Sequence, residues 1–180
     1  VDLFRLSDRG LSDNPSLYLN FKSSKDQAVN KKQKITVRPV RENDRTAWDE
    51  LYRGYAAFYK VAQSNEMRDT VWSWLHDASA VSEGLVAETG NGKLIGLTHF
   101  RPFARPLTAT TGGFLDDLFV SPDARGQGVA DALIESVRAI ASKRGWSIVR
   151  WITAEDNYRG RGVYDRVALK TSWITYDIKM

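Results

Sequence analysis

One loop of this chain combines small residues, a cation and a following helix in a way that can bind phosphate groups. Its residues are Arg125, Gly126, Gln127, Gly128, Val129 and Ala130. The glycines allow a tight turn that directs several backbone N–H groups toward one point, and the helix N-terminus behind them adds a partial positive charge. These features are typical of a pyrophosphate site. A glycine-containing helix start without a ligand would have the same sequence. The residues on either side of the loop are therefore needed to distinguish the two interpretations.

Two other phosphate-binding loops do not fit these residues. A dinucleotide-binding fingerprint needs a third glycine at the position of Asp131, and a P-loop needs Gly-Lys followed by Ser or Thr. The pattern Arg125-x-x-Gly128-x-Ala130 instead resembles the acyl-CoA pyrophosphate loop of the GNAT superfamily of N-acetyltransferases. The resemblance implies acetyl-CoA as co-substrate.

Composition limits the classes of protein to which this chain can belong. Its 180 residues suffice for one domain with a core, and 42% hydrophobic and 27% charged residues are ordinary for a globular protein. The absence of cysteine excludes disulfides and cysteine nucleophiles, and with only two histidines we expect no metal site. No apolar run approaches the roughly 20 residues of a membrane span, and a net charge of +4 suits an anionic co-substrate but is too small to indicate nucleic acid. We expect a cytoplasmic protein, acting as a homodimer, with no membrane or nucleic-acid partner.

The chain divides near residue 34. Residues 1–34 are rich in Ser, Asp, Asn and Lys, and we interpret them as an N-terminal extension or arm. Residues 35–180 form the expected N-acetyltransferase domain, because strand and helix patterns alternate along them. Strands are predicted at 35–40, 84–88, 93–103, 114–120, 147–153 and 171–179. Helices are predicted after an N-cap at Asn43 or Asp44, at about 65–77, at 130–144 and at 157–168.

This order of elements resembles the GNAT superfamily over roughly residues 35–180. The resemblance implies an α/β fold with a mixed, mostly antiparallel central sheet that is flanked by helices and splayed between its fourth and fifth strands. In that family the pantetheine arm enters the gap and pairs with exposed backbone groups of the fourth strand. Here the implied contacts are Leu118, Phe119 and Val120.

A second pattern lies near the C-terminus. Asn157-x-x-Gly160-x-x-Val163-Tyr164-x-x-x-Ala168 resembles the family pattern Asn-x-x-Ala-x-x-Leu-Tyr-x-x-x-Gly. The Asn157 amide can hydrogen-bond the pantetheine arm. Tyr164, about two helical turns later, can reach the thioester sulfur and protonate the departing thiolate. The alternative is a core tyrosine whose hydroxyl is hydrogen-bonded within the protein. Gly160 and Gly162 each cost about 1 kcal/mol relative to alanine inside a helix, and they indicate a short or irregular helix.

Two adjacent carboxylates interrupt the apolar strand before the loop. An ammonium has no lone pair, so the acceptor amine must lose a proton before it attacks the thioester. Asp116 and Asp117 are adjacent, and we expect them to face opposite sides of the strand. By resemblance to diamine acetyltransferases, Asp116 takes the place of the glutamate base and Asp117 matches the neighbouring aspartate. A solvated pair at a sheet entrance is the other interpretation.

The remaining candidate residues have simpler interpretations. His76 ends a predicted helix, where a cation is stabilised by the helix dipole. His99 lies on the third predicted strand, where its side chain either faces the cleft or packs in the core. The aromatics at 52, 55, 58 and 59 can bind an alkylammonium group, but we interpret most of them as core or wall.

The last part of the chain narrows the resemblance. It looks like the fungal subgroup of histone, polyamine and D-amino-acid N-acetyltransferases, and the matching residues are Trp151, Ile152, Thr153, Asn157, Tyr164, Val167, Ala168, Lys170 and Thr171. We therefore predict acetyl transfer from acetyl-CoA to a primary amine of a small molecule or peptide, by direct attack. The alternatives are a non-catalytic acyl-CoA sensor, which would not need Tyr164 or a carboxylate, and a toxin-like enzyme that acetylates aminoacyl-tRNA.

Overall fold

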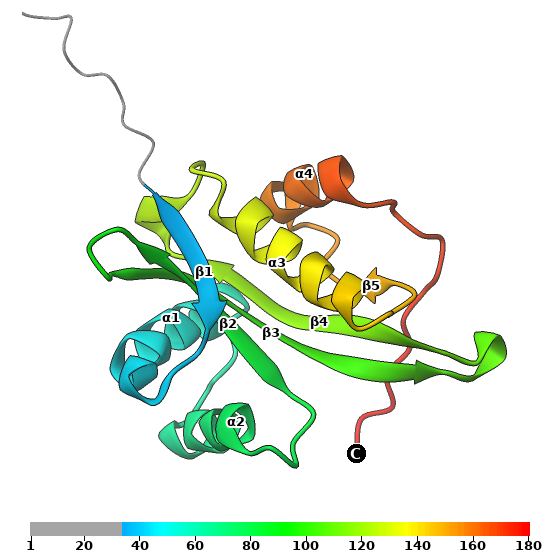
Figure 1. Ribbon diagram of the computed structural model, residues 1–180, viewed down its shortest axis with the longest axis horizontal. Coiled ribbons are helices and arrows are strands. Elements are labelled where there is room, and N and C mark those ends of the chain that lie inside the picture. Colours follow the sequence, from blue (N-terminus) through cyan, green and yellow to red (C-terminus); the bar gives the residue numbers. More distant parts are fainter. Residues whose placement is uncertain (1–33) are drawn as a thin grey trace, which may run out of the picture. The chain divides into compact units, whose positions relative to one another are not determined.

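The computed structural model describes residues 34–180 (Figure 1). The predicted arm, except for Lys34, lies outside the described residues. A five-stranded sheet in the order β1-β2-β3-β4-β5 forms the centre of the described part. The strands are β1 (Ile35–Pro39), β2 (Glu83–Thr89), β3 (Leu94–Arg105), β4 (Thr110–Val120) and β5 (Val149–Arg150). The first four pair antiparallel and β4 pairs parallel with β5, so the predicted α/β fold with a mixed, mostly antiparallel sheet is confirmed.

Helices cover both faces of the sheet (Figure 1). They are α1 (Arg45–Phe58), α2 (Asn65–His76), α3 (Val129–Lys143) and α4 (Tyr158–Val167), with short 3-10 turns at Glu42–Asp44, Pro106–Thr108 and Pro122–Ala124. One face packs against α1 and α2 and the opposite face against α3, while α4 contacts α3. In the described part of the chain, no helix is long and apolar enough to cross a membrane.

Two apolar clusters, one on each face, hold the helices to the sheet. Leu133 and Val137 of α3 lie one turn apart and are fully buried against the sheet. On the other face, Trp48 of α1 is fully buried and packs with Leu97 of β3. Burial of a leucine of this kind contributes about 2 kcal/mol. The apolar residues of α1 and α3 therefore form the buried side of each helix.

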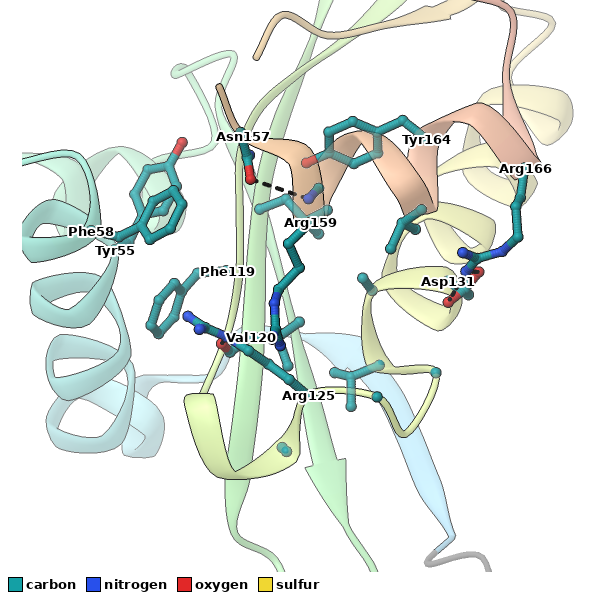
Figure 2. A pocket seen from close by; sticks show the side chains of 18 of the residues that line it. Tyr55, Phe58, Phe119, Val120, Arg125, Asp131, Asn157, Arg159, Tyr164 and Arg166 are labelled. Carbon is teal, nitrogen blue, oxygen red and sulfur yellow. Dashed lines mark hydrogen bonds and ion pairs between the residues drawn. The ribbon is translucent and has the colours of Figure 1, made fainter. Parts of the chain in front are cut away.

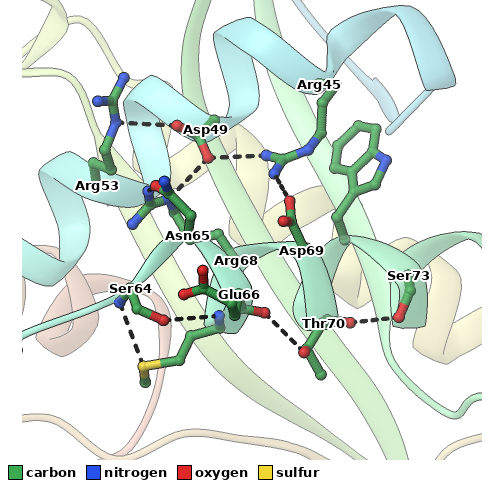
Figure 3. A network of polar contacts seen from close by, with 12 residues as sticks. Arg45, Asp49, Arg53, Ser64, Asn65, Glu66, Arg68, Asp69, Thr70 and Ser73 are labelled. Atoms are coloured by element: carbon green, nitrogen blue, oxygen red, sulfur yellow. Dashed lines mark hydrogen bonds and ion pairs between the residues drawn. The ribbon is translucent and has the colours of Figure 1, made fainter.

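Polar contacts fix the position of α1 against its neighbours. The Asp49 carboxylate of α1 accepts hydrogen bonds from Arg45 at 2.9 Å and from the buried Arg68 of α2 at 2.8 Å, and Arg53 forms a third ion pair with it at 3.0 Å (Figure 3). Burial opposes the charge of Asp49, but the hydrogen bonds from Arg68 and Arg45 outweigh it and lower its pKa. This network joins α1 to α2 beside the sheet.

The N-cap predicted for α1 does not form. Asp44 occupies the N-cap position, but its carboxylate accepts hydrogen bonds from the Arg38 guanidinium of β1 and from the backbone N–H of Arg41 instead of capping α1. The hydrogen bond from Arg38 lowers the pKa of Asp44. The local sequence predicts an N-cap at Asp44. In the folded chain its carboxylate binds Arg38 of the sheet instead.

The fifth strand is much shorter than predicted. Of residues 147–153 only Val149 and Arg150 form β5, and they pair with Gly113 and Phe114. Beyond Phe114, within the described residues, no strand pairs with β4 on the side of β5. The sheet therefore opens between its fourth and fifth strands, and the backbone of Leu118 to Val120 borders the gap.

The prediction of a strand at 171–179 is wrong. Residues 168–180 have no regular secondary structure and are exposed. Apolar residues alternate at 174, 176 and 178, as in a strand with one apolar face. A strand also needs a neighbour with a free edge, and within the described residues this segment pairs with none.

Candidate active site

A cavity of about 440 Å³ lies where the gap between β4 and β5 meets the loop before α3 and the helix α4 (Figure 2). Most residues predicted to bind the co-substrate line it: Leu118, Phe119, Val120, Arg125, Gly126, Gly128, Val129, Ala130 and Asn157. Tyr164 lines it as well. Gln127 does not line the cavity, because its side-chain amide donates to the carbonyl of Asp123 at 3.2 Å.

The loop has the backbone of a phosphate cradle. Gly126 and Gly128 have φ angles of +79° and +83°, a region that residues with a Cβ rarely adopt. Apart from the adjacent residues of the chain, no described residue has an atom within 4 Å of where a Cβ would stand on either glycine. Gly128 is also the N-cap of α3, so the unpaired N–H groups of the first turn of that helix begin at this point. The loop therefore offers both open space and backbone donors to an anion.

Cations add to this anion-binding character. Arg125 donates from Nε to the carbonyl of Val120 at 3.2 Å, and its guanidinium lies against the Phe119 ring. Arg159 of α4 also extends into the cavity (Figure 2). Sequence reasoning missed Arg159, and its position one residue after the start of α4 gives no signal that the side chain points inward. Arg166 closes the rim through an ion pair with Asp131 at 3.0 Å, which ties α4 to α3.

Asn157 organises the start of α4. Its Oδ1 accepts from the backbone N–H of Gly160 at 3.1 Å (Figure 2), and its Nδ2 donates to Thr153 at 3.0 Å. A Cβ on Gly160 would stand 2.6 Å from that amide nitrogen, so the departure from the family alanine allows the amide to fold over the first turn. The amide keeps one N–H and one oxygen lone pair for another partner.

Tyr164 presents an acid to the cavity. Its ring packs edge-on against Trp151 with the ring centres 5.4 Å apart, and its hydroxyl points into the cavity (Figure 2). Burial, with a smaller contribution from Tyr59, raises the pKa of Tyr164 to about 12. The hydroxyl therefore carries its proton at neutral pH and can act as a donor to a group in the cavity.

A bulge in β4 places both carboxylates on one face of the sheet. His99 pairs with Asp117 and Phe100 with Leu115, so Asp116 is an extra residue opposite β3. Leu118 packs on the same face as Leu115, which an uninterrupted strand would not allow. The expectation that the two aspartates face opposite sides is therefore wrong. Both lie on the face covered by α1.

Asp117 is anchored by its neighbours. Its Oδ2 accepts from His99 Nδ1 at 2.8 Å and from the Tyr52 hydroxyl at 3.2 Å. Burial, and then the charge of Asp117, raises the pKa of Tyr52, so that phenol stays a donor. His99 is itself buried and contacts Trp48. These contacts fix the orientation of the carboxylate.

Asp116 has a different environment. Its side chain is 33% exposed and its carboxylate lies 3.3 Å from Nε of Arg101. Burial raises the pKa of the Asp116 carboxyl, Arg101 opposes that shift, and the negative charge of Asp117 adds to it. The two carboxylates therefore differ, since one is anchored by two donors and the other has a raised proton affinity. Such a difference is a common basis for acid–base roles.

The remaining candidates from the sequence, His76 and the aromatic residues at the end of α1, have structural roles. His76 lies in the last turn of α2, with Nδ1 3.0 Å from the carbonyl of Trp72. Tyr55, Phe58 and Tyr59 form the α1 side of the cavity, as the wall interpretation predicts.

Together these features match one enzyme family. The sequence profile of the Acetyltransferase (GNAT) family matches residues 48–168, which include the loop, both carboxylates, Asn157 and Tyr164. The chain belongs to the GNAT family. This confirms the predicted family and enzyme class, an N-acetyltransferase. The roles of the individual site residues stay predictions.

Relatives of this GNAT acetyltransferase match about four fifths of its length. It is 30% identical over 144 residues to the D-amino-acid N-acetyltransferase HPA3 of Saccharomyces cerevisiae, covering 79% of this chain and 89% of the relative. It is similar to the solved ribosomal-protein-alanine N-acetyltransferase from Brucella melitensis biovar Abortus 2308, with a TM-score of 0.69 and 25% identity over 82% of this chain and 99% of that one. The fold is also similar to that of aminoglycoside N-acetyltransferase AAC(6')-Iy, which was solved in complex with CoA. The TM-score is 0.71 and the identity 17%, over 82% of this chain and 95% of that one.

Proposed function

We propose that this protein transfers an acetyl group from acetyl-CoA to a primary amine by direct attack of the amine on the thioester. The observation that carries the proposal is a single cavity in which the glycine loop, Asn157 and Tyr164 meet, at the strand that also bears Asp116 and Asp117. An acyl-CoA sensor would need the loop but neither a proton donor nor a proton acceptor. The enzyme therefore explains more of these residues than the sensor does.

Acetyl-CoA fits the residues that line the cavity. The open backbone at Gly126 and Gly128, with Arg125 and Arg159 nearby, suits the pyrophosphate and its negative charge. The edge of β4 from Leu118 to Val120, which pairs with no strand of the described residues on the side of β5, suits the amides of the pantetheine arm. The remaining N–H of Asn157 can donate to the same arm.

The three ionisable residues then have distinct roles. Asp117, fixed by His99 and Tyr52, attracts the ammonium of the acceptor. Asp116 removes one of its protons, directly or through a water, so that the nitrogen lone pair can form the new bond to the acetyl carbon. The bond from that carbon to sulfur breaks as Tyr164 gives its proton to the departing thiolate, and the nitrogen of the new amide loses its second proton to the tyrosinate or to water. No covalent acyl-enzyme is needed.

An amino acid or a comparably small amine is the acceptor that we propose. The name of the yeast relative supports this choice, since that enzyme is a D-amino-acid N-acetyltransferase. Two carboxylates on the acceptor face suit a positively charged amine and repel the phosphates of an RNA. This disfavours the alternative of a toxin that acetylates aminoacyl-tRNA.

We also propose that the protein is a homodimer. The segment after α4 exposes Trp173, Ile174, Tyr176 and Ile178, each by at least 75%. Side chains of this type are seldom left so exposed together. A second copy of the chain is the occupant that we propose for this segment.

The test of the proposed function is an acetylation assay with the purified protein. Acetyl-CoA is supplied with D- and L-amino acids, polyamines and a lysine peptide, and CoA release is compared with the mass of the acetylated product. We expect N-acetylation of at least one class of amine, and no mass increase of the protein when acetyl-CoA is supplied alone. Tight binding of acetyl-CoA without transfer to any amine would favour the sensor.

A further inference from the structure

We propose that Arg101 is the residue that recognises a carboxylate on the acceptor, so that the preferred substrates are amino acids rather than simple amines. The proposal rests on the acetyl transfer proposed above and adds a specificity-determining residue to it. Arg101 lies on β3, two residues after His99, and therefore on the same face as the two aspartates. Its guanidinium contacts Asp116 in the bulge of β4.

The guanidinium of Arg101 is only partly used by the protein. Among the described residues, it donates a side-chain hydrogen bond only from Nε, to Asp116 at 3.3 Å. Arg38 and Arg68, by contrast, each donate from Nε and both terminal nitrogens to protein acceptors. The terminal nitrogens of Arg101 are therefore available, and a guanidinium with two free N–H groups binds a carboxylate in bidentate fashion.

The side chain is held in place without being buried. Its guanidinium carbon lies 5.2 Å from the centre of the Phe114 ring, and Phe103 packs edge-on against that ring. The side chain is 38% exposed, so a small solute can reach it. An aromatic support of this kind orients a guanidinium and leaves its hydrogen-bonding edge free.

The spacing suits an α-amino acid. In such a substrate a single carbon separates the ammonium from the carboxylate, and here Arg101 and Asp116 are in direct contact. A substrate can therefore place its carboxylate on Arg101 and its ammonium at Asp116 and Asp117 together. A simple amine would use the aspartates alone.

Binding of a carboxylate to Arg101 would also change Asp116. The guanidinium at present stabilises the negative charge of Asp116, while the charge of Asp117 opposes it. A substrate carboxylate that takes over part of the guanidinium leaves Asp116 with a higher proton affinity.

The experiment compares pairs of acceptors that differ only in the carboxylate. Phenylalanine, as D and L forms, is paired with 2-phenylethylamine, and lysine with cadaverine, and kcat/KM is measured for each. We expect the wild type to prefer the amino acid in each pair that it accepts. Arg101→Gln should lower kcat/KM for the amino acid by about 10- to 100-fold, the effect of a lost hydrogen bond between charged groups, and should change the amine by less than about 3-fold.

Arg105→Gln is the matched control, because Arg105 lies on the same strand and the same face but donates to Ser147. It should leave both members of each pair unchanged. Equal use of acid and amine by the wild type, or a parallel loss of both in Arg101→Gln, would overturn the assignment of Arg101 and leave the acetyltransferase intact. Failure to acetylate any amine would overturn the proposed function and this assignment with it.

Discussion

The indole of Trp48 determines which nitrogen of His99 carries the proton. Nε1 of Trp48 lies 3.0 Å from Nε2 of His99, and an indole N–H can only donate. Nε2 of His99 is therefore the acceptor, and the ring proton lies on Nδ1, which donates to Asp117. Both nitrogens of His99 are used, so the ring has no lone pair for a substrate proton. His99 positions Asp117, and the aspartates remain the candidates for the base.

Exchange of each aspartate for asparagine should separate their roles. Asp116→Asn should lower kcat and flatten the acidic limb of the pH profile, because the group whose raised pKa controls that limb is gone. In the wild type, activity should fall as the pH drops through the pKa of Asp116, which lies above the ordinary value of 3.8. Asp117→Asn should mainly raise the KM for the amine. Normal kinetics of both variants at every pH would show that another group or the solvent deprotonates the amine.

The glycine loop can be tested against a glycine of the same conformation elsewhere. Gly145, beyond the other end of α3, has a φ of +68° and open space around its Cβ position, as Gly128 has. Gly128→Val and Gly145→Val should each lower stability by about 1–3 kcal/mol through backbone strain. Only Gly128→Val should also weaken CoA binding, by at least about tenfold. Equal CoA affinities in the two variants, measured by calorimetry, would place the pyrophosphate elsewhere.

The network around Asp49 should contribute to stability in a pH-dependent way. Asp49→Ala leaves the buried Arg68 without this partner and should lower the free energy of unfolding by about 3 kcal/mol at neutral pH. The folded-state pKa of Asp49 is depressed, so its contribution is present above the unfolded value of about 3.8 and is lost as the pH falls through the folded-state value. Asp69→Ala is the control, because that side chain is 66% exposed and its loss should change stability by less than about 1 kcal/mol. Equal effects in urea unfolding would refute a special role for Asp49.

The exposed segment after α4 should decide the oligomeric state. Ile174→Asp combined with Ile178→Asp puts charge on one side of this segment and should convert a dimer to a monomer in sedimentation analysis. Leu107→Asp, at a fully exposed tip between β3 and β4, should have no such effect. A wild type that sediments as a monomer at micromolar concentration would contradict the homodimer.

Local patterns predict the parts of this fold that local forces determine. The helix predicted at 130–144 and the glycines of the loop before it appear where the sequence places them. The bulge at Asp116 was not predictable, because it depends on the register against β3. The use of Asp44 by Arg38 likewise depends on a contact between the sheet and a turn.

Tertiary context also limits what the sequence shows of the site. The strand pattern at 171–179 is real as a pattern, but it meets no free edge among the described residues. No sequence pattern distinguishes Arg159 or Arg101 from the other arginines. Only the folded chain places Arg159 at the cavity and Arg101 at the bulge. The residues of the GNAT motifs, by contrast, could be named from their resemblance to the family patterns.

The kinetics of Tyr164→Phe test the central proposal most directly. Tyr158→Phe is the matched control, since Tyr158 is on the same helix and 75% exposed. Removal of the Tyr164 hydroxyl should lower kcat about 10- to 10⁴-fold, the range for lost acid–base catalysis, with little change in acetyl-CoA affinity, whereas Tyr158→Phe should keep normal turnover. A Tyr164→Phe variant with normal kcat, under conditions in which acetyl transfer limits the rate, would contradict the proposed mechanism.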